Sequence, residues 1–196
     1  MPRAGLTSQR VVEQAAAVAD ETGLERLTLA AVAARFGVTI PSLYKHVHGL
    51  DGLQRDLAVL AVRELTAALS RAAVGRAGSD ALRAVAHAYR QYAKAHPGRY
   101  AASVRAPAPD ATEHQAVGAD AVAVIAAVLA GYGITGLAAT DAIRGLRAAM
   151  HGFVALEGAG GFGLPQSVDA SYARLVDALD TAFRNWPTAG ADTGGS

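Results

Sequence analysis

The sequence predicts an all-α protein in which a small head of three N-terminal helices precedes a larger helical domain. Apolar residues recur at intervals of three and four along most of the chain, which is the helical period. Alanine, the strongest helix former, supplies much of the 52% hydrophobic content. No segment alternates apolar and polar residues as a half-buried strand does. These observations favour helices throughout, separated by glycine- and proline-containing turns.

The first two helices are predicted from apolar spacing and from their end signals. The first covers residues 7–22 and ends at Gly23; its apolar residues are Val11, Val12, Ala15, Val18 and Ala19. The second covers residues 29–36, with the Thr28 hydroxyl as an N-cap. Gly37 ends this helix, because glycine tolerates left-handed backbone dihedrals.

A third short helix, residues 40–48, follows so closely that the second and third helices form a helix-turn-helix. Thr39 is the expected N-cap, and Pro41 is tolerated because the N–H groups of a first turn are unpaired. The motif needs a small residue where the helices cross, here Ala33, and glycine in the turn, here Gly37. The apolar residues expected to lock the helices together are Val32, Phe36, Val38, Leu43 and Val47.

One face of the third helix has the chemistry of a DNA-reading surface. At about 100° per residue, Leu43 and Val47 face the core. The opposite face carries Pro41, Ser42, Tyr44 and Lys45, flanked by Ile40 and His46. Such side chains suit phosphate contacts and base-edge hydrogen bonds in a major groove. An ordinary polar surface helix is the alternative, but the crossing alanine and the turn glycine in register favour DNA.

The remaining chain is predicted to be helical as far as residue 186. A long fourth helix covers residues 50–73, and a linker covers 75–79. Later helices are expected at residues 80–95, 100–105, 113–130, 137–157 and 168–186. Residues 188–196 are small and polar, which predicts a disordered tail.

Composition excludes several classes of protein. The 196 residues include no cysteine, so a disulfide framework, a zinc–thiolate site and a cysteine nucleophile are excluded. A net charge of +1 excludes a polybasic nucleic-acid wrapper, so any DNA site must be a local patch. The N-terminus lacks a secretory leader pattern, and the uncharged stretch 121–140 is interrupted by glycines from Gly131 onward. We therefore expect a cytoplasmic protein in which this stretch is a buried helix followed by a loop.

An enzyme and a scaffold protein are the two alternatives from other classes. Gly131, Gly133 and Gly136 match a dinucleotide-binding pattern, and Glu157 lies 21 residues beyond the last of them. That site needs a parallel sheet, which the sequence does not predict, so interhelical loops are preferred. Neither a metal-binding histidine motif nor a nucleophile elbow is present, and we expect no catalysis, metal or cofactor. A helical interaction protein with no DNA role stays open at this point.

The head resembles the TetR-type repressors. The segment Thr28–Val38, followed by Ser42-Leu43-Tyr44-Lys45-His46-Val47, is similar to the signature of that family, and the match covers about residues 7–60. Further on, Met150-His151-Gly152-Phe153 resembles a C-terminal subclass named for a Trp-His-Gly motif, with Met150 in place of tryptophan. The turn at residues 96–100 is also similar to one that is common in this subclass.

The resemblance implies a homodimeric, one-component transcriptional regulator, expected to be a repressor that a small-molecule effector releases from operator DNA. It implies a DNA-binding domain at residues 1–49, a ligand-binding and dimerisation domain at 50–187 and a tail at 188–196. Residues matching DNA-contacting positions are Thr28, Ile40, Pro41, Ser42, Tyr44, Lys45 and His46. Candidate polar anchors of an effector pocket are His87, Tyr89, Tyr92, His114, Tyr132 and His151.

The start of the fourth helix departs from the family pattern. Where the family usually places Ser/Asn-Lys to contact phosphate, this chain has Gly49 and Leu50. Leu50 then either lies against the DNA backbone without neutralising it or packs inward against Val47 and Leu53.

Overall fold

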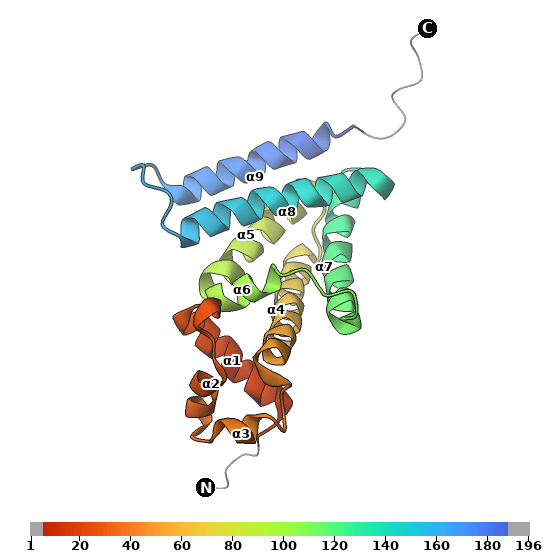
Figure 1. Ribbon diagram of the computed structural model, residues 1–196. Helices are drawn as coiled ribbons and strands as arrows, with labels where there is room; N and C mark the ends of the chain where they lie inside the picture. Colours follow the sequence, from red (N-terminus) through yellow and green to blue (C-terminus); the bar gives the residue numbers. More distant parts are fainter. Residues whose placement is uncertain (1–5, 188–196) are drawn as a thin grey trace. The chain divides into compact units, whose positions relative to one another are not determined.

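The computed structural model describes residues 6–187, and the tail expected at residues 188–196 lies outside this range. All regular secondary structure in the described range is helical, which confirms the predicted fold class (Figure 1). The elements are α1 (Ser8–Thr22), a 3-10 turn (Leu24–Arg26), α2 (Leu29–Phe36), α3 (Ile40–Leu43), α4 (Gly49–Ala73), α5 (Gly78–Ala95), α6 (Pro97–Ser103), α7 (Thr112–Ala130), α8 (Gly136–Gly158) and α9 (Val168–Arg184).

The third helix is shorter than predicted. α3 ends at Leu43, and the chain then turns, with the His46 N–H donating to the Leu43 carbonyl oxygen at 2.8 Å. The expected Thr39 cap is also wrong: its hydroxyl lies 3.2 Å from the Ser42 hydroxyl and makes no capping hydrogen bond. With Pro41 in the first turn and no side-chain cap, little local hydrogen bonding sustains a longer helix.

Contacts divide the described chain into two compact units. Unit 1 comprises the residues up to Leu65 together with Ala95–Gly118, and unit 2 comprises Thr66–Lys94 and the residues from Ala119 onward. The division therefore falls within α4 and α7, and it does not coincide with the expected domain boundary after residue 49. The functional domains named above stay a prediction.

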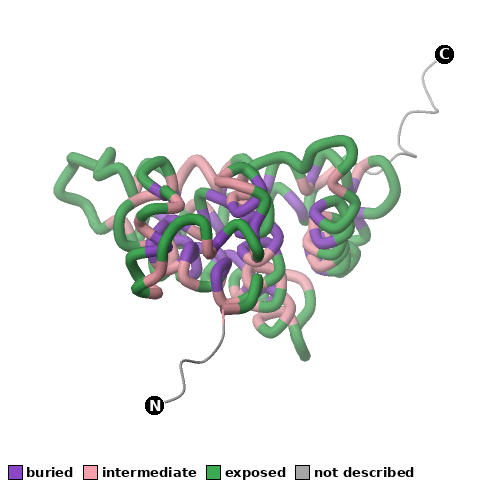
Figure 2. The backbone as a smooth tube through the Cα atoms, turned by 60° about the horizontal axis from the view of Figure 1, so that its bottom comes forward, coloured by how far each residue is buried: buried purple, intermediate pink, exposed green. Residues whose placement is uncertain are grey.

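Unit 1 has one hydrophobic core. Its fully buried members include Val11, Ala15 and Leu57, from α1 and α4. In Figure 2, buried and exposed positions alternate along the helices, as expected for amphipathic elements. α6 packs closely on α1 within this unit, because Gly98 has no side chain and approaches the backbone of Ala19.

Unit 2 combines the C-terminal parts of α4 and α7 with α5, α8 and α9. α8 and α9 lie side by side (Figure 1). Arg90 of α5 is buried and donates to both carboxylate oxygens of Glu157 in α8, at 2.7 and 2.6 Å. Its guanidinium also lies 4.9 Å from the ring centroid of Tyr172 in α9. One charged residue thus joins three helices.

α7 only partly meets the expectation for residues 121–140. A helix does precede a glycine-containing turn, but Val122 is 49% exposed while Val128 and Leu129 are buried. By length and composition alone, α7 is the single helix in the described residues that could span a membrane, and 28% of its apolar window is buried.

Candidate nucleic-acid interface

The helix-turn-helix forms through local hydrogen bonds at the ends of α2. The Thr28 hydroxyl accepts from the Ala31 N–H at 3.1 Å, which confirms the predicted cap. Gly37 adopts φ +63°, a left-handed value that favours glycine. The Val38 N–H then donates to the Ala33 carbonyl at 3.1 Å, so the chain leaves α2 in a fixed direction.

Packing fixes the second half of the motif. Ala33 is buried where α2 and α3 cross, and Val32, Leu43 and Val47 are buried with it. Phe36 and Val38 are partly buried against the same core. The predicted locking residues therefore all contribute to the head, although Val47 does so from the turn after α3.

The predicted reading face points away from this core. Tyr44 is 59% exposed, Ile40 is 37% exposed, and Pro41 and Lys45 are exposed as well. Ser42 and His46 are half-buried. Since Leu43 and Val47 anchor the segment from below, these side chains are held outward on a rigid support. The surface offers hydroxyl, ammonium and imidazole groups, which are suited to phosphates and base edges.

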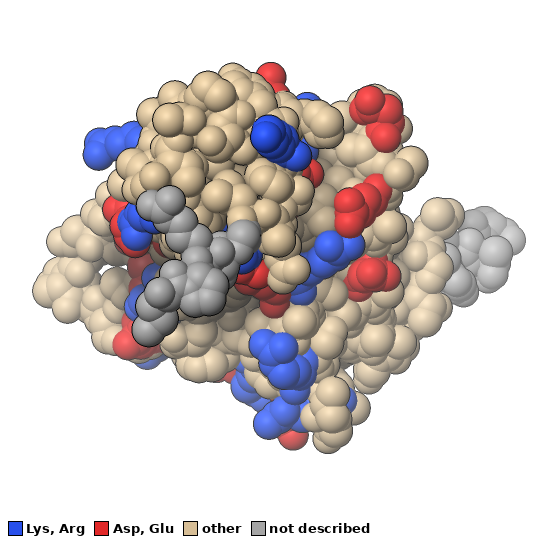
Figure 3. All heavy atoms as spheres, turned by 90° about the horizontal axis from the view of Figure 1, so that it is seen from below, with Lys and Arg blue, Asp and Glu red and all other residues tan. Residues whose placement is uncertain are grey.

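Positive charge on the molecule is sparse. On the face shown in Figure 3, Lys and Arg occur in small groups, with acidic and uncharged side chains between them. In α2, Arg35 is engaged in an ion pair with Glu21 of α1. Lys45 is therefore the basic side chain of the reading face. Such a surface offers few cationic groups to phosphates.

The start of α4 shows whether Leu50 packs inward or lies on the outer surface. Leu50 is half-buried and packs against the hydrophobic core of the head. Asp51, the next residue, is exposed in the first turn of α4. The inward alternative for Leu50 is therefore the one that the structure adopts. The rotation that places Leu53 and Leu57 in the core also brings Leu50 to the same side.

The six candidate effector anchors do not form one group. His114 lies in unit 1, whereas the other five lie in unit 2. Tyr89 and Tyr92 are buried, His151 is half-buried, and His87 is exposed. Tyr132 donates from its hydroxyl to Asp180 at 2.6 Å, and burial together with this bond raises the pKa of Tyr132 to about 12.

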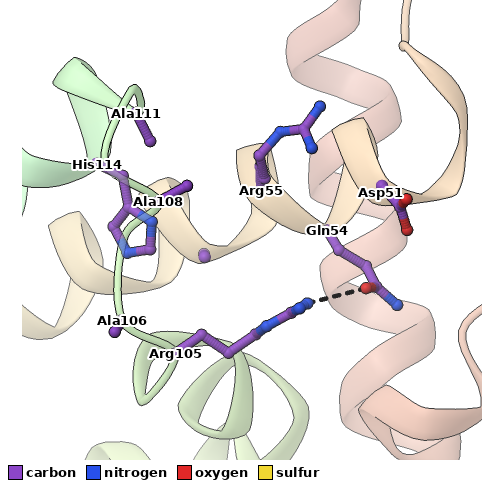
Figure 4. Close-up of a pocket in the computed structure, with 9 residues that line it drawn as sticks. Asp51, Gln54, Arg55, Arg105, Ala106, Ala108, Ala111 and His114 are labelled. Carbon is purple, nitrogen blue, oxygen red and sulfur yellow. Dashed lines mark hydrogen bonds between the residues drawn. The ribbon is translucent and has the colours of Figure 1, made fainter.

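A cavity in unit 1 includes only His114 of these six anchors (Figure 4). Its other polar lining residues are Asp51, Gln54, Arg55 and Arg105. No sequence motif marks the two arginines or the glutamine, because their approach depends on the packing of α4 against the chain after α6.

Comparisons with known proteins decide the family. Residues 82–179 match a family described as tetracyclin repressor-like, C-terminal domain. A helix-turn-helix-type transcriptional regulator of Mycobacterium tuberculosis, Rv0681, is 40% identical over 155 residues, covering 79% of this chain and 71% of that protein. The chain belongs to the TetR family. Another such regulator, YobS of Bacillus subtilis, is 35% identical over 79% of this chain and 81% of its own length.

Solved structures share the TetR fold. A protein of unknown function from Rhodococcus sp. RHA1 superposes with a TM-score of 0.72 at 25% identity, covering 94% of this chain and 97% of that one. The TetR protein ActR of Streptomyces coelicolor, solved in complex with (S)-DNPA, has a TM-score of 0.67 at 16% identity, with 93% and 98% covered. At this identity the second likeness shows the fold alone.

Membership of the TetR family makes the chain a DNA-binding transcriptional regulator and not an enzyme. The dinucleotide alternative is wrong: Gly131, Gly133 and Gly136 lie in and after the turn between α7 and α8, and no strand occurs in residues 6–187. Membership of the family is also inconsistent with the alternative of a helical interaction protein that has no DNA role. The Trp-His-Gly subclass stays a prediction, although its Met150–Phe153 segment lies within the matched C-terminal region.

Proposed function

We propose that this TetR-type regulator is a cytoplasmic homodimeric repressor that reads a palindromic operator through α3 and the turn after it. The proposal rests on the fact that apolar and polar side chains around Leu43 lie on opposite sides of the segment. Buried Leu43 and Val47 anchor the segment, while Tyr44 and Lys45 are presented to solvent. The proposed DNA contacts are Thr28, Ile40, Pro41, Ser42, Tyr44, Lys45 and His46.

Each contact has a role that its chemistry supports. Lys45 suits a phosphate or a guanine edge, and Tyr44 suits a phosphate or a thymine methyl group. Thr28 already uses its hydroxyl oxygen to cap α2, so it would donate its hydroxyl proton to a phosphate. Ile40 offers only an apolar contact.

Dimerisation is proposed through α8 and α9. These helices lie side by side in unit 2, and Leu156 of α8 is 52% exposed. A second copy packed on α8 and α9 would cover this leucine, since obligate dimer interfaces are large and apolar. Light scattering at micromolar concentration should give twice the chain mass of 20.0 kDa, and a monomer would contradict the proposal.

The proposed repressor is released by a small-molecule effector. ActR, which shares the fold, was solved with a small molecule bound. An effector must bind the DNA-free conformation more tightly than the DNA-bound one, since equal affinity shifts nothing.

Selection of bound sequences from random duplex DNA tests the proposal directly. We expect a near-palindrome whose half-sites lie about one helical turn apart, or a multiple of it. Tyr44→Ala and Lys45→Ala should each weaken operator binding, by about 1–3 kcal/mol where the side chain reads a base. Arg71→Ala, an exposed arginine on the distal part of α4, is the matched control and should bind normally. Unchanged binding by both head variants would remove α3 from the interface.

A further inference from the structure

A cavity of about 310 Å³ lies wholly within unit 1. One wall is the beginning of α4, and the others are the chain after α6 and the first turn of α7 (Figure 4). The lining residues are Asp51, Gln54, Arg55, Ala58, Arg105, Ala106, Ala108, Ala111 and His114. This volume is at the lower end of the range for small-molecule sites, so it fits a small ligand.

His114 is the unusual member of the lining. Its side chain belongs to a residue that is only 7% exposed, yet it makes no hydrogen bond or ion pair within residues 6–187. Among the described residues, the fully enclosed side-chain atoms without a hydrogen-bond partner are Thr66 Oγ1 and Arg99 Nε, so the ring nitrogens of His114 keep some accessible surface. Since His114 lines the cavity, a ligand in the cavity can pair with them. Imidazole always has at least one N–H to donate, so a hydrogen-bond acceptor in the cavity would complete it.

The two arginines supply positive charge beside this histidine. Arg105 donates from Nη1 to the Gln54 side-chain oxygen at 2.9 Å, which leaves other N–H groups of its guanidinium for a ligand. Within residues 6–187 neither Arg105 nor Arg55 forms a salt bridge, although the positive charge of Arg55 acts on the neighbouring Asp56 carboxylate. Glu113, the acidic residue next to His114, is engaged by Arg63 at 2.7 Å and does not compete for them.

The only carboxylate in the lining is that of Asp51. In Figure 4 Asp51 and His114 lie at opposite sides of the view, with Arg55 and Arg105 between them. The Arg105 side chain extends toward Gln54, so its guanidinium lies between the His114 and Asp51 sides of the view. An anionic group therefore fits between this guanidinium and the His114 ring. The Asp51 end suits a hydroxyl or amine of the same ligand.

We propose that this cavity binds a small organic anion, a carboxylate or a phosphate ester, through Arg105, Arg55 and His114. Guanidinium groups match the planar geometry of both anions and form charge-assisted hydrogen bonds with them. The alanine methyl groups of the lining contact the apolar part of the ligand. The step from binding to regulation rests on the proposed repressor function, with this anion as the effector.

The position of the cavity connects it to the DNA-reading segment. α4 begins at Gly49, directly after the turn that carries Tyr44 and Lys45, and residues 51–58 of α4 form one wall. An anion held between Arg55 of α4 and His114 of α7 fixes the start of α4 against the rest of unit 1. That constraint favours one position of the head and so changes operator affinity.

Calorimetry without DNA tests the site. The probes are benzoate and phenyl phosphate, with benzamide as the uncharged control. Wild type should bind at least one of the anions below about 1 mM, and Arg105→Met and His114→Phe should each weaken it at least about tenfold, since each loses a charge-assisted or buried hydrogen bond. Arg71→Met should bind as wild type does, and Asp51→Asn should bind more tightly because a like charge is removed.

Three results would overturn the proposal. These are no binding of either anion at about 10 mM, equal binding of benzamide, or full binding by Arg105→Met. Because Arg105 is exposed, Arg105→Met should fold even if His114→Phe does not.

DNA binding separates a free anion from a DNA phosphate as the occupant. Without an added anion, Arg105→Met should bind the operator with the affinity of wild type. The slope of log affinity against log salt concentration, called the salt slope below, should also be unchanged. The added anion should lower operator affinity in wild type only. A reduced salt slope in Arg105→Met would show that the arginine holds DNA phosphate and would overturn the proposal. Failure of the chain to bind any DNA would refute the repressor function, while the calorimetric result would still stand.

Discussion

Replacing Gly98 with alanine should strongly destabilise unit 1. An ideal Cβ at this position would lie 2.1 Å from both the carbonyl carbon and the oxygen of Ala19, and 2.5 Å from the Asp20 nitrogen. These are backbone atoms of α1, so no side-chain rotation relieves the overlap. Ordinary carbon contacts are about 3.5–4.0 Å, so α6 must move away from α1 by more than about 1 Å.

The energetic cost follows from two contributions. Overpacking of this kind costs about 1–3 kcal/mol. The same movement stretches the hydrogen bond from the Arg99 N–H to the Asp20 carboxylate, now 2.9 Å, and hydrogen bonds to charged groups contribute about 1.5–3 kcal/mol. A total of about 2.5–6 kcal/mol corresponds to a melting temperature lowered by about 5–24 °C in a chain of this size.

Thermal unfolding of Gly98→Ala followed by circular dichroism, at fixed protein concentration, measures this effect. Gly118→Ala is the matched control, because Gly118 lies inside α7 and a Cβ there meets nothing within 4 Å. It should raise the melting temperature slightly, since alanine is better than glycine in a helix by about 0.5–1 kcal/mol. A wild-type melting temperature for Gly98→Ala would refute the close packing of α6 on α1.

Further outcomes concern the head and the buried ion pair. Leu50→Lys should lower the melting temperature and leave the salt slope of DNA binding unchanged, because Leu50 packs on the core; a steeper slope with normal stability would place it on phosphate. Lys45→Ala should reduce the slope by about 0.9 for each subunit in which it contacts phosphate, with an unchanged circular dichroism spectrum. Hydrogen bonds from Arg90 and then Lys94 lower the pKa of Glu157 to about 2 from an ordinary 4.5. A lowered pKa means that this stabilisation is complete above pH 4.5 and is lost as pH falls toward 2, by at most about 3 kcal/mol. Denaturant unfolding should show a smaller loss of stability over this pH range in Glu157→Gln than in wild type, because the other paired carboxylates, such as Asp180, still titrate.

The helix-turn-helix could be predicted in detail because its determinants are local. Thr28 caps α2 with an N–H only three residues away, and Gly37 provides the left-handed conformation within its own residue. The same reasoning failed at Thr39, where the hydroxyl pairs with Ser42 in place of capping. Two similar local hydrogen bonds compete there, and the sequence does not show which one forms.

The reading face was predicted from the two apolar residues on the opposite side of the same segment. Leu43 and Val47 are buried as the helical period requires, and this alone directs Tyr44 and Lys45 outward. The length of α3 did not matter for this result, because a turn that continues from a helix keeps nearly the same rotation per residue. The six candidate effector anchors show the opposite case. Residue type alone suggested them, and no periodic pattern related one to another.

The sequence by itself therefore determined the fold class, the order of the helices, the helix-turn-helix and the outward face of the reading segment. Each depends on residues within about four positions of one another, where spacing and backbone preference act directly. The spacing left two positions open for Leu50, and the structure decided between them. The tertiary structure alone decided that Gly98 lets α6 approach α1, and that Arg105 and His114 share a cavity. These contacts join residues far apart in the chain, and their energies depend on how helices pack, which composition and periodicity do not encode.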